Sequence, residues 1–519
     1  MNRRFAVATT VVLLLAVGSV SAEAAVPCES LIRLALPDGT VTTAESVAAG
    51  GFVPPVTPGR TITAGARDAL AKLPAFCRVA ITSKPSADSD IKIEVWLPVV
   101  AWNGKLQAVS DGGLAGFIPY ALMAPALAQG YVASGTDTGH VGGNADFMPG
   151  HPEKLVDFAY RSTHQMAVAA KSVIAEFYGD PPTWSYLNAC SGGGRHALTS
   201  AQRYPRDFQG IVAGAASWDQ ARLDAARIGI NLTVNRSTES QIPPSKYSMI
   251  HSAVLQACDA ADGVKDGVLE NPRRCAFDYA VLACKGADGP SCLTAPQVES
   301  AKALTSPFKD PRSGRTLLES HLWPGAEPQR ATLGGPEPPT NSLDRVRRFH
   351  LKDPTWVFSL GNIAADIDRA VRMDGGLLAS IDFNLAPFFD RGGKLLMWHG
   401  WADPQVPAEH STIFFNNVVR AVGPGAEQSL ALFMLPGVGH CGGGLGPDTF
   451  DKMGAISEWV ERGVKPSRII ASRVTDGRVD RTRPLCPFPQ VARYRGQGSI
   501  DDAANFSCVV ETESNFPRR

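Results

Sequence analysis

Hydrophobic and polar residues follow one another along the first part of the chain in a pattern that predicts alternating strands and helices. Segment 91–98 alternates residue by residue and stops at a proline, which is typical of a strand. Residues 164–178 carry apolar side chains at helical spacing and end at Gly179, a common helix terminator. Three further short runs also predict strands: 105–110, 130–134 and 183–187. A helix between strands favours βαβ units, and therefore an α/β fold with a largely parallel sheet.

The pattern breaks between residues 215 and 385 and then returns. The middle segment holds four cysteines, several Asp-Gly turns and proline-rich stretches. After it, the patterns at 394–398 and 430–435 predict strands, and 450–462 predicts a final helix. A chain of 519 residues is also too long for one ordinary domain. We therefore predict one α/β domain, built from residues 25–214 and 386–519, with a second domain at 215–385 inserted into it.

The first residues have the organisation of a secretory signal peptide. Two arginines at positions 3 and 4 precede an apolar run at 5–20, and Ala22-Glu23-Ala24 forms a small-residue cleavage site. The alternative is a short N-terminal membrane anchor. No other stretch is long and apolar enough to span a bilayer. We predict that residues 1–24 are removed and that the mature protein is secreted or periplasmic.

Composition narrows the class of protein and the state of its cysteines. Lys plus Arg and Asp plus Glu both number 50, which gives no basic excess of the kind that nucleic-acid binders show, although a local patch remains open. Ten cysteines in an exported chain suggest complete pairing into disulfides. Sequence does not give the connectivity. Pairing of neighbours yields Cys258–Cys275, Cys284–Cys292 and Cys486–Cys508, which leaves Cys28–Cys77 and Cys190–Cys441.

The segment Asn188-Ala-Cys-Ser-Gly-Gly-Gly-Arg195 is the strongest chemical motif. It follows a predicted strand and precedes a helical pattern, which is the context of a nucleophile elbow presenting Ser191. The usual motif is G-x-S-x-G, and Ala189 stands here in place of the first glycine. The alternative interpretation is a flexible glycine-rich loop.

A serine nucleophile needs a base and an acid, and two later loops offer them. Asp403 and His440 each follow a predicted strand, so the chain order is Ser, Asp, His, as in α/β-hydrolases. We predict Ser191, Asp403 and His440 as the catalytic triad of an α/β-hydrolase sheet. The competing residues are His399, interpreted as structural, and the acids Asp111 and Asp266.

Two cysteines give independent support for this triad. Cys190 precedes Ser191 and Cys441 follows His440, and the serine oxygen and imidazole nitrogen must come within roughly 3 Å of each other. That proximity is compatible with a Cys190–Cys441 disulfide. The oxyanion requires two backbone N–H groups, which we expect from Gly192 and Gly113. The alternative for Gly112-Gly113 is an ordinary tight turn.

The insert carries a candidate cation site. Asp259, Asp262 and Asp266 lie close together among Asp-Gly turns, and the carbonyls of Val264 and Val268 offer further oxygen ligands. Oxygen ligands suit a hard cation, although the spacing is not that of an EF-hand. A solvated, turn-rich loop is the alternative.

Cys190-Ser191, Asp403 and His440-Cys441 together resemble the CS-D-HC signature of the tannase and feruloyl esterase family, which includes MHETase. The resemblance extends over nearly the whole mature chain. It implies a lid domain between serine and acid, a disulfide beside the triad, and structural Ca²⁺ in the lid. The implied calcium ligands are Asp259, Asp262, Asp266 and the carbonyls of Val264 and Val268.

By this resemblance the protein is a secreted esterase acting on esters of aromatic acids such as ferulate, gallate or terephthalate. Their alcohol part would belong to a small molecule, a plant polysaccharide or a polyphenol. Two alternatives remain: a triad esterase for acetylated polysaccharide or aliphatic esters, and a hydrolase-fold binding protein without turnover. Family members usually have Gly where Ala189 stands, and a larger residue where Gly192 stands. Trp356 and Phe358 are candidates for an aromatic-acid pocket, with core packing as the favoured role.

Overall fold

A ten-stranded sheet forms the centre of the protein, in the order β1-β2-β3-β4-β6-β5-β7-β8-β11-β12. The structure is a computed structural model that describes residues 24–56, 61–332, 335 and 337–511. The predicted signal peptide lies outside the described residues except for Ala24. The strands of this sheet are β1 (Ala35–Leu36), β2 (Gly39–Val47), β3 (Phe76–Ser83), β4 (Ile91–Pro98), β5 (Lys105–Ser110), β6 (Val132–Thr136), β7 (Trp184–Cys190), β8 (Gly210–Gly214), β11 (Lys394–Gly400) and β12 (Leu430–Leu435).

The sheet has an antiparallel part and a parallel part. Strands β1 to β4 pair antiparallel with one another, and β4 pairs antiparallel with β6. From β6 onward, all neighbouring strands are parallel. The prediction of a largely parallel sheet is therefore wrong for the N-terminal strands. The link from β3 to β4 is too short for a helical crossover, and a short link returns the chain in the antiparallel direction.

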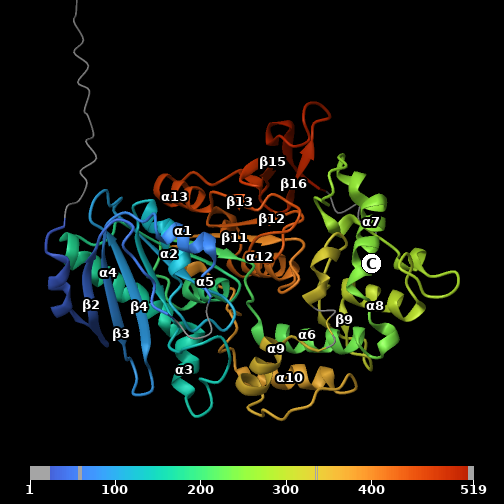
Figure 1. The fold of residues 1–519 in the computed structure, drawn as a ribbon, viewed down its shortest axis with the longest axis horizontal. Helices are drawn as coiled ribbons and strands as arrows, with labels where there is room; N and C mark the ends of the chain where they lie inside the picture. The colour runs from blue at the N-terminus through green and yellow to red at the C-terminus, as the bar shows by residue number, and fades with distance from the viewer. Residues whose placement is uncertain (1–23, 57–60, 333–334, 336, 512–519) are drawn as a thin grey trace, which may run out of the picture.

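Helices cover both faces of the sheet (Figure 1). Because both faces are covered, β6, β8 and β12 are buried along their whole length and read as continuous apolar or small-residue runs. One face packs against α4 (Ser162–Tyr178), α5 (Gly192–Arg203), α11 (Ala386–Phe389) and α12 (Glu409–Val422). The other packs against α1 (Ala64–Leu70), α2 (Tyr120–Ala128) and α13 (Lys452–Arg462). The short helix α3 (Pro152–Val156) precedes α4.

The segment between β8 and β11 adds no described strand to the central sheet. It lies beside the sheet, in green and yellow in Figure 1, and has its own apolar clusters. Both predicted boundaries of the insert, 215 and 385, fall within this segment. Its elements are α6 (Gln220–Val234), α7 (Tyr247–Cys258), α8 (Ala295–Thr305), β9 (Phe308–Lys309), β10 (Thr316–Leu318), α9 (Thr340–Asp344) and α10 (Ile363–Asp374). We call the segment between β8 and β11 the lid.

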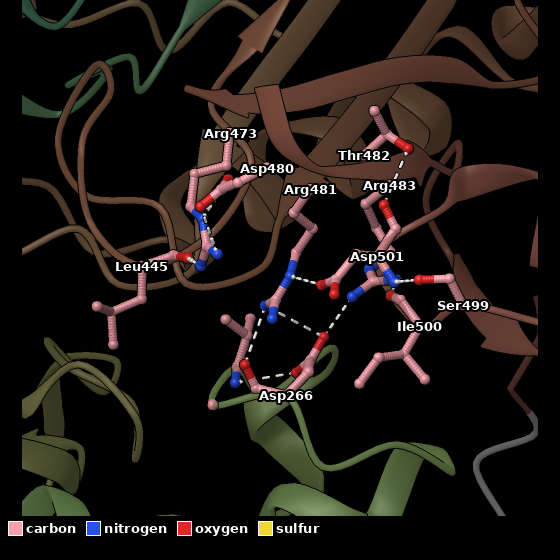
Figure 2. Close-up of polar contacts among 12 residues, drawn as sticks. Asp266, Leu445, Arg473, Asp480, Arg481, Thr482, Arg483, Ser499, Ile500 and Asp501 are labelled. Carbon is pink, nitrogen blue, oxygen red and sulfur yellow. Dashed lines mark hydrogen bonds and ion pairs between the residues drawn. The ribbon is translucent and has the colours of Figure 1, made fainter. Parts of the chain in front are cut away.

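The C-terminal residues form two small sheets that contact the lid. Figure 2 shows Asp266 of the lid facing Arg481 and Arg483. Arg481 donates to the carbonyl oxygen of Asp266 at 2.9 Å, and Arg483 donates to its carboxylate. This contact joins the lid to the end of the chain. The two sheets consist of β13 (Thr449–Phe450), β14 (Ile469–Thr475) and β15 (Arg478–Leu485), and of β16 (Gln490–Tyr494) and β17 (Phe506–Val510).

All ten cysteines are paired in the structure, and the pairs are those that the sequence suggested. Among the residues that the structure describes, no helix has the length and hydropathy to cross a membrane. The disulfides are Cys28–Cys77, Cys190–Cys441, Cys258–Cys275, Cys284–Cys292 and Cys486–Cys508.

A buried ion pair joins α6 to the residues after α9. Arg345 donates to both oxygens of Asp224, at 2.6 and 2.8 Å, and both side chains are almost completely buried. We expect Asp224→Asn to lower the free energy of unfolding by about 3–5 kcal/mol, because it leaves buried guanidinium charge uncompensated. The matched control is Asp368→Asn, whose partner Arg315 is half exposed, and its cost should stay below about 1 kcal/mol. Urea denaturation of both variants measures the difference, and equal costs would contradict the prediction.

Candidate active site

The backbone turns sharply between β7 and α5, and Ser191 lies at the turn. Ser191 has φ 64° and ψ −125°, a conformation that few non-glycine residues adopt. Its N–H donates to the carbonyl of Gly214 on β8 at 2.9 Å, which holds the turn against the sheet. The strand–turn–helix arrangement is that of the nucleophile elbow predicted from the sequence.

Glycines are required around Ser191 because atoms of neighbouring residues lie where the Cβ of any other residue would be. A Cβ at Gly193 would lie 2.4 Å from the carbonyl oxygen of Ser110, and one at Gly194 would lie 2.5 Å from that of Gly214. A Cβ at Gly112 would lie 2.8 Å from the Cβ of Ser191. No side chain fits at these positions without movement of the backbone or the nucleophile, so the glycine-rich loop is a packed turn.

The structure brings Ser191, His440 and Asp403 into one hydrogen-bonded chain. His440 Nε2 lies 2.7 Å from Ser191 Oγ, and His440 Nδ1 lies 2.7 Å from Asp403 Oδ2. With the Nδ1 proton directed at the carboxylate, Nε2 is free to accept the serine proton. The other oxygen of Asp403 accepts the N–H groups of Gln405 and Val406 at 2.7 and 3.0 Å, which fixes the carboxylate.

His399 contacts the same carboxylate oxygen of Asp403 as His440 does. Its Nε2 lies 3.1 Å from both Asp403 Oδ2 and the carbonyl oxygen of Val406. Since both neighbours are acceptors, Nε2 carries a proton and donates, while Nδ1 lies 2.8 Å from Ser411 Oγ. His399 therefore helps to orient the acid, which agrees with the structural role inferred from the sequence.

The electrostatics of Asp403 favour its ionised form. Burial opposes the charge, but the neighbouring His440 and hydrogen bonds from His399 and His440 outweigh it and hold the pKa of Asp403 well below its usual range. The two rival acids have other partners. Asp111 accepts the N–H of Gly112 at 2.8 Å, and Asp266 lies against Arg481 and Arg483.

The two predicted oxyanion donors lie beside the nucleophile. The N–H of Gly192 is the first of α5, and a Cβ on Gly192 would lie 3.1 Å from the backbone nitrogen of Gly113. Gly113 has φ 66°, a conformation that favours glycine. The turn at Gly112-Gly113 is thus packed against the elbow, and both nitrogens are close to the Ser191 side chain.

A disulfide joins the nucleophile loop to the histidine loop. Cys190 and Cys441 have a Cα separation of 6.0 Å and lie 251 positions apart in the chain. Their bond therefore holds Ser191 and His440 together although the two residues lie far apart in the sequence.

Two cavities meet at Ser191. The larger, of about 560 Å³, lies on the side of α2 and α13. The smaller, of about 330 Å³, lies under the lid. Ser191, Gly113 and Gln405 line both cavities, whereas His440 lines only the larger one. Trp356 and Phe358 line neither, and pack instead against the apolar cluster of the lid.

The loop at residues 259–270, which we call the acidic loop of the lid, encloses a small cavity lined by carboxylate side chains and by residues whose backbone carbonyls could serve as ligands. The cavity measures about 10 Å³, and Asp262, Val264, Asp266 and Val268 line it. That volume is close to one water-sized sphere. Asp259 is not among the lining residues, and its carboxylate accepts the N–H groups of Asp266 and Gly267 at 3.4 and 3.1 Å.

Glu270 also lines this cavity, and sequence reasoning missed it. Burial raises the pKa of Glu270 to about 8 and that of Asp262 to about 6. Asp266 pairs with Arg481 and Arg483, which line the same cavity, whereas the hydrogen bonds of Asp262 and Glu270 come from backbone N–H groups. These two carboxylates and the backbone carbonyls are oxygen ligands of the kind that suit a hard cation. A second group with metal-like spacing, Cys284, Asp288 and Cys292, does not fit, since its thiols form a disulfide.

The sheet, the elbow and the inserted lid define an α/β hydrolase. The chain belongs to the tannase and feruloyl esterase family, whose model matches residues 77–341 and 360–509. An uncharacterized esterase of Xanthomonas campestris pv. campestris is 34% identical over 94% of this chain and 92% of its own length. A probable feruloyl esterase B-2 of Aspergillus terreus is 31% identical over 84% of this chain and 86% of its own length.

Solved structures agree with this assignment. The crystal structure of feruloyl esterase B from Aspergillus oryzae matches with a TM-score of 0.84 and 28% identity, over 93% of this chain and 99% of that one. Tannin acyl hydrolase from Aspergillus niger shares the fold with a TM-score of 0.76 and 22% identity, over 94% and 95% of the two chains. The protein is a carboxylic ester hydrolase of the feruloyl esterase and tannase type.

The disulfide beside Ser191 generates a prediction about activity. We expect Cys190→Ala/Cys441→Ala to lower kcat/KM for 4-nitrophenyl acetate by about 100-fold, because a small displacement of nucleophile from base is costly. The control is Cys284→Ala/Cys292→Ala, a pair in the lid only 8 positions apart, which should keep full activity. Full activity in the first variant would show that the loops hold their geometry without the bond.

Proposed function

We propose that the protein hydrolyses esters of aromatic acids through an acyl-enzyme formed on Ser191. The observation that carries the mechanism is the hydrogen-bonded chain from Ser191 Oγ through His440 to Asp403, with 2.7 Å at each step. Family membership and the feruloyl esterase relatives support the aromatic acid.

The reaction proceeds in two half-reactions, and His440 transfers a proton in each of them. His440 Nε2 takes the proton of Ser191 as the oxygen attacks the ester carbonyl, and Asp403 stabilises the imidazolium that forms. The N–H groups of Gly192 and Gly113 stabilise the oxyanion. His440 then protonates the leaving alcohol, and a water molecule activated by the same histidine releases the acid.

His440 also determines which cavity receives which half of the ester. The leaving oxygen must lie beside His440 Nε2, and His440 lines the larger cavity only. The alcohol therefore occupies the larger cavity and the acyl group the smaller one under the lid. The larger cavity has polar side chains, Gln107, Gln129 and Lys452, which suit a sugar or polyphenol alcohol.

We further propose that the acidic loop of the lid holds structural Ca²⁺. The residues that would hold it are Asp262, Asp266 and the carbonyls of Val264 and Val268, with Asp259 completing the predicted set and Glu270 close by. A bound cation would compensate the buried carboxylates of Asp262 and Glu270, which accept backbone N–H groups, whereas Asp266 already pairs with two arginines. Five disulfides and the predicted signal peptide support a secreted or periplasmic protein.

A turnover panel tests the proposed function. We expect the wild type to hydrolyse methyl ferulate, methyl gallate or hydroxyethyl terephthalate faster than 4-nitrophenyl acetate, because the acyl cavity accommodates an aromatic ring. Ser191→Ala should lower kcat at least about 10⁴-fold, since it removes the nucleophile. Ser252→Ala, an exposed serine on α7, is the control and should be unaffected.

The other outcomes of this panel are informative. Turnover of acetate esters alone would favour an esterase for non-aromatic substrates. No turnover by the wild type of any ester would favour a binding protein.

Removal of metal tests the calcium proposal. Exhaustive EDTA treatment should lower Tm and added Ca²⁺ should restore it, since an ion at 100 times its Kd stabilises the folded state by about 2.7 kcal/mol. The response should disappear in Asp262→Asn and persist in Asp278→Asn, an acid of the lid outside the lining of the small cavity. An unchanged Tm in the wild type after EDTA would refute the proposal.

A further inference from the structure

A second loop holds the turn that carries Gly113. It comprises residues 137–142, which follow β6, and we call it the brace loop. The N–H of Gly116 donates to the carbonyl oxygen of Gly142 at 2.7 Å, and the N–H of Gly142 donates to that of Gly116 at 3.1 Å. A Cβ on Gly116 would lie 2.5 Å from Cδ2 of His140, so the imidazole of the brace loop packs directly on the turn.

Two side chains of the brace loop also contact carbonyl oxygens of the turn. His140 Nε2 lies 3.1 Å from the carbonyl oxygen of Leu114, and Thr138 Oγ1 lies 3.1 Å from that of Ala115. A carbonyl oxygen can only accept, so Nε2 carries a proton and donates, as does the threonine hydroxyl. Burial lowers the pKa of His140 to about 4, so its ring is neutral at pH 7 with the proton on Nε2.

The imidazole of His140 is fixed by its surroundings. His140 is 3% exposed, stacks on Phe147 with ring centroids 3.9 Å apart, and meets Phe158 edge-on at 5.6 Å. A buried polar group is costly unless it is hydrogen-bonded, and the partner of Nε2 is the turn. The ring therefore joins an aromatic cluster to the Leu114 carbonyl.

The backbone of the brace loop is strained at Thr138. Its φ is 60°, a conformation that β-branched residues rarely adopt. The N–H of Gly139 donates to Asp137 Oδ1 at 2.9 Å, and the N–H of Lys92 on β4 donates to the same oxygen at 2.9 Å. Strained residues of this kind persist only where the surrounding structure holds them, and they cluster at active sites.

The turn needs such support because its own backbone is permissive. Gly112 and Gly113 are consecutive glycines, and a glycine backbone adopts many conformations of similar energy. The N–H of Gly113 is useful to the reaction only if it is oriented before charge develops on the substrate. Leu114 directly follows Gly113, so a hydrogen bond that fixes the Leu114 carbonyl restricts the peptide units beside Gly113.

We propose that His140 and Thr138 are positioning residues for the oxyanion donor at Gly113, because they bind the two carbonyl groups that follow it in the chain. This inference rests on the proposed function, in which the Gly113 N–H stabilises the oxyanion formed on Ser191. Neither His140 nor Thr138 lines either cavity at Ser191, so their effect on the reaction passes through the turn.

Two amide substitutions at position 140 separate this role from packing. The amide nitrogen of glutamine stands the same number of bonds from the backbone as Nε2 of histidine, whereas that of asparagine reaches only the position of Nδ1. We expect His140→Asn to lower kcat for 4-nitrophenyl acetate about 10- to 100-fold and to change KM less than about 3-fold, because a displaced donor weakens only the transition state. His140→Gln should keep kcat within about 3-fold of the wild type.

The same comparison applies at Thr138. Thr138→Ser keeps the hydroxyl that donates to Ala115 and should leave kcat close to the wild-type value. Thr138→Ala removes it and should lower kcat about 3- to 10-fold, because one neutral hydrogen bond is lost. Wild-type kcat in both Thr138→Ala and His140→Asn would overturn the inference.

A transition-state analogue probes the oxyanion site without turnover. Ser191 Oγ adds to the boron of phenylboronic acid, its proton passes to His440, and the tetrahedral anion places an oxygen where the oxyanion would lie. Benzamide stays planar and forms no such bond. In His140→Asn the Ki of phenylboronic acid should rise about 10- to 100-fold, and that of benzamide less than about 3-fold. Both constants are independent of the fraction of folded enzyme, so a destabilised variant remains interpretable.

His164→Asn is the matched control. The ring of His164 stacks on Tyr204 at 3.9 Å, as that of His140 stacks on Phe147, but its hydrogen bond goes to Asp207. The control should leave kcat and both inhibition constants unchanged.

The remaining outcomes distinguish this inference from the proposed function. Equal losses of kcat in His140→Asn and His140→Gln, or parallel rises of both inhibition constants, would mean a role in packing and would overturn the inference while the proposed function stands. A wild type that neither hydrolyses esters nor binds phenylboronic acid would overturn the proposed function, and the positioning role with it.

Discussion

Parallel pairing of β7, β8, β11 and β12 is the constraint on which the active site depends. In a parallel sheet the carboxyl ends of neighbouring strands lie at the same edge, and Ser191, Asp403 and His440 each follow the end of one of these strands. Residues from three distant parts of the chain therefore meet without any of them being neighbours in sequence. The backbone turn at Ser191 and the disulfide beside it then fix the position of the serine relative to His440.

The lid contributes residues to the surroundings of Ser191 that the central sheet does not contribute. It contributes most of the lining of the smaller cavity at Ser191, including the buried side chains of Arg227 and Arg345. Two features join the lid to the rest of the protein: α6 is the first helix after β8, and the acidic loop contacts β15 through Asp266. Ser191, Asp403 and His440 thus follow strands of the central sheet, whereas the smaller cavity beside them is lined mainly by residues of the lid.

The structure brings together the three side chains that the sequence proposed as a triad, and each of them carries a local signal. Ser191 lies between a strand and a helix, His440 and Asp403 follow apolar runs, and the flanking cysteines could be matched by their position beside the pair. The direction of the N-terminal strands had no such signal, since apolar alternation is the same in parallel and antiparallel pairing. Glu270 was not predicted either, because a glutamate after a loop has no distinguishing pattern in the sequence until packing buries it.

The bond between Cys190 and Cys441 closes a covalent ring that contains the entire lid. A protease that cuts one exposed turn of the lid would open this ring without separating the two ends that flank it. The nicked chain would remain a single molecule, with its nucleophile and base still joined by a bond between neighbouring residues. At the proposed location outside the cytoplasm, where proteases are common, this topology would protect the reacting centre from damage to the lid.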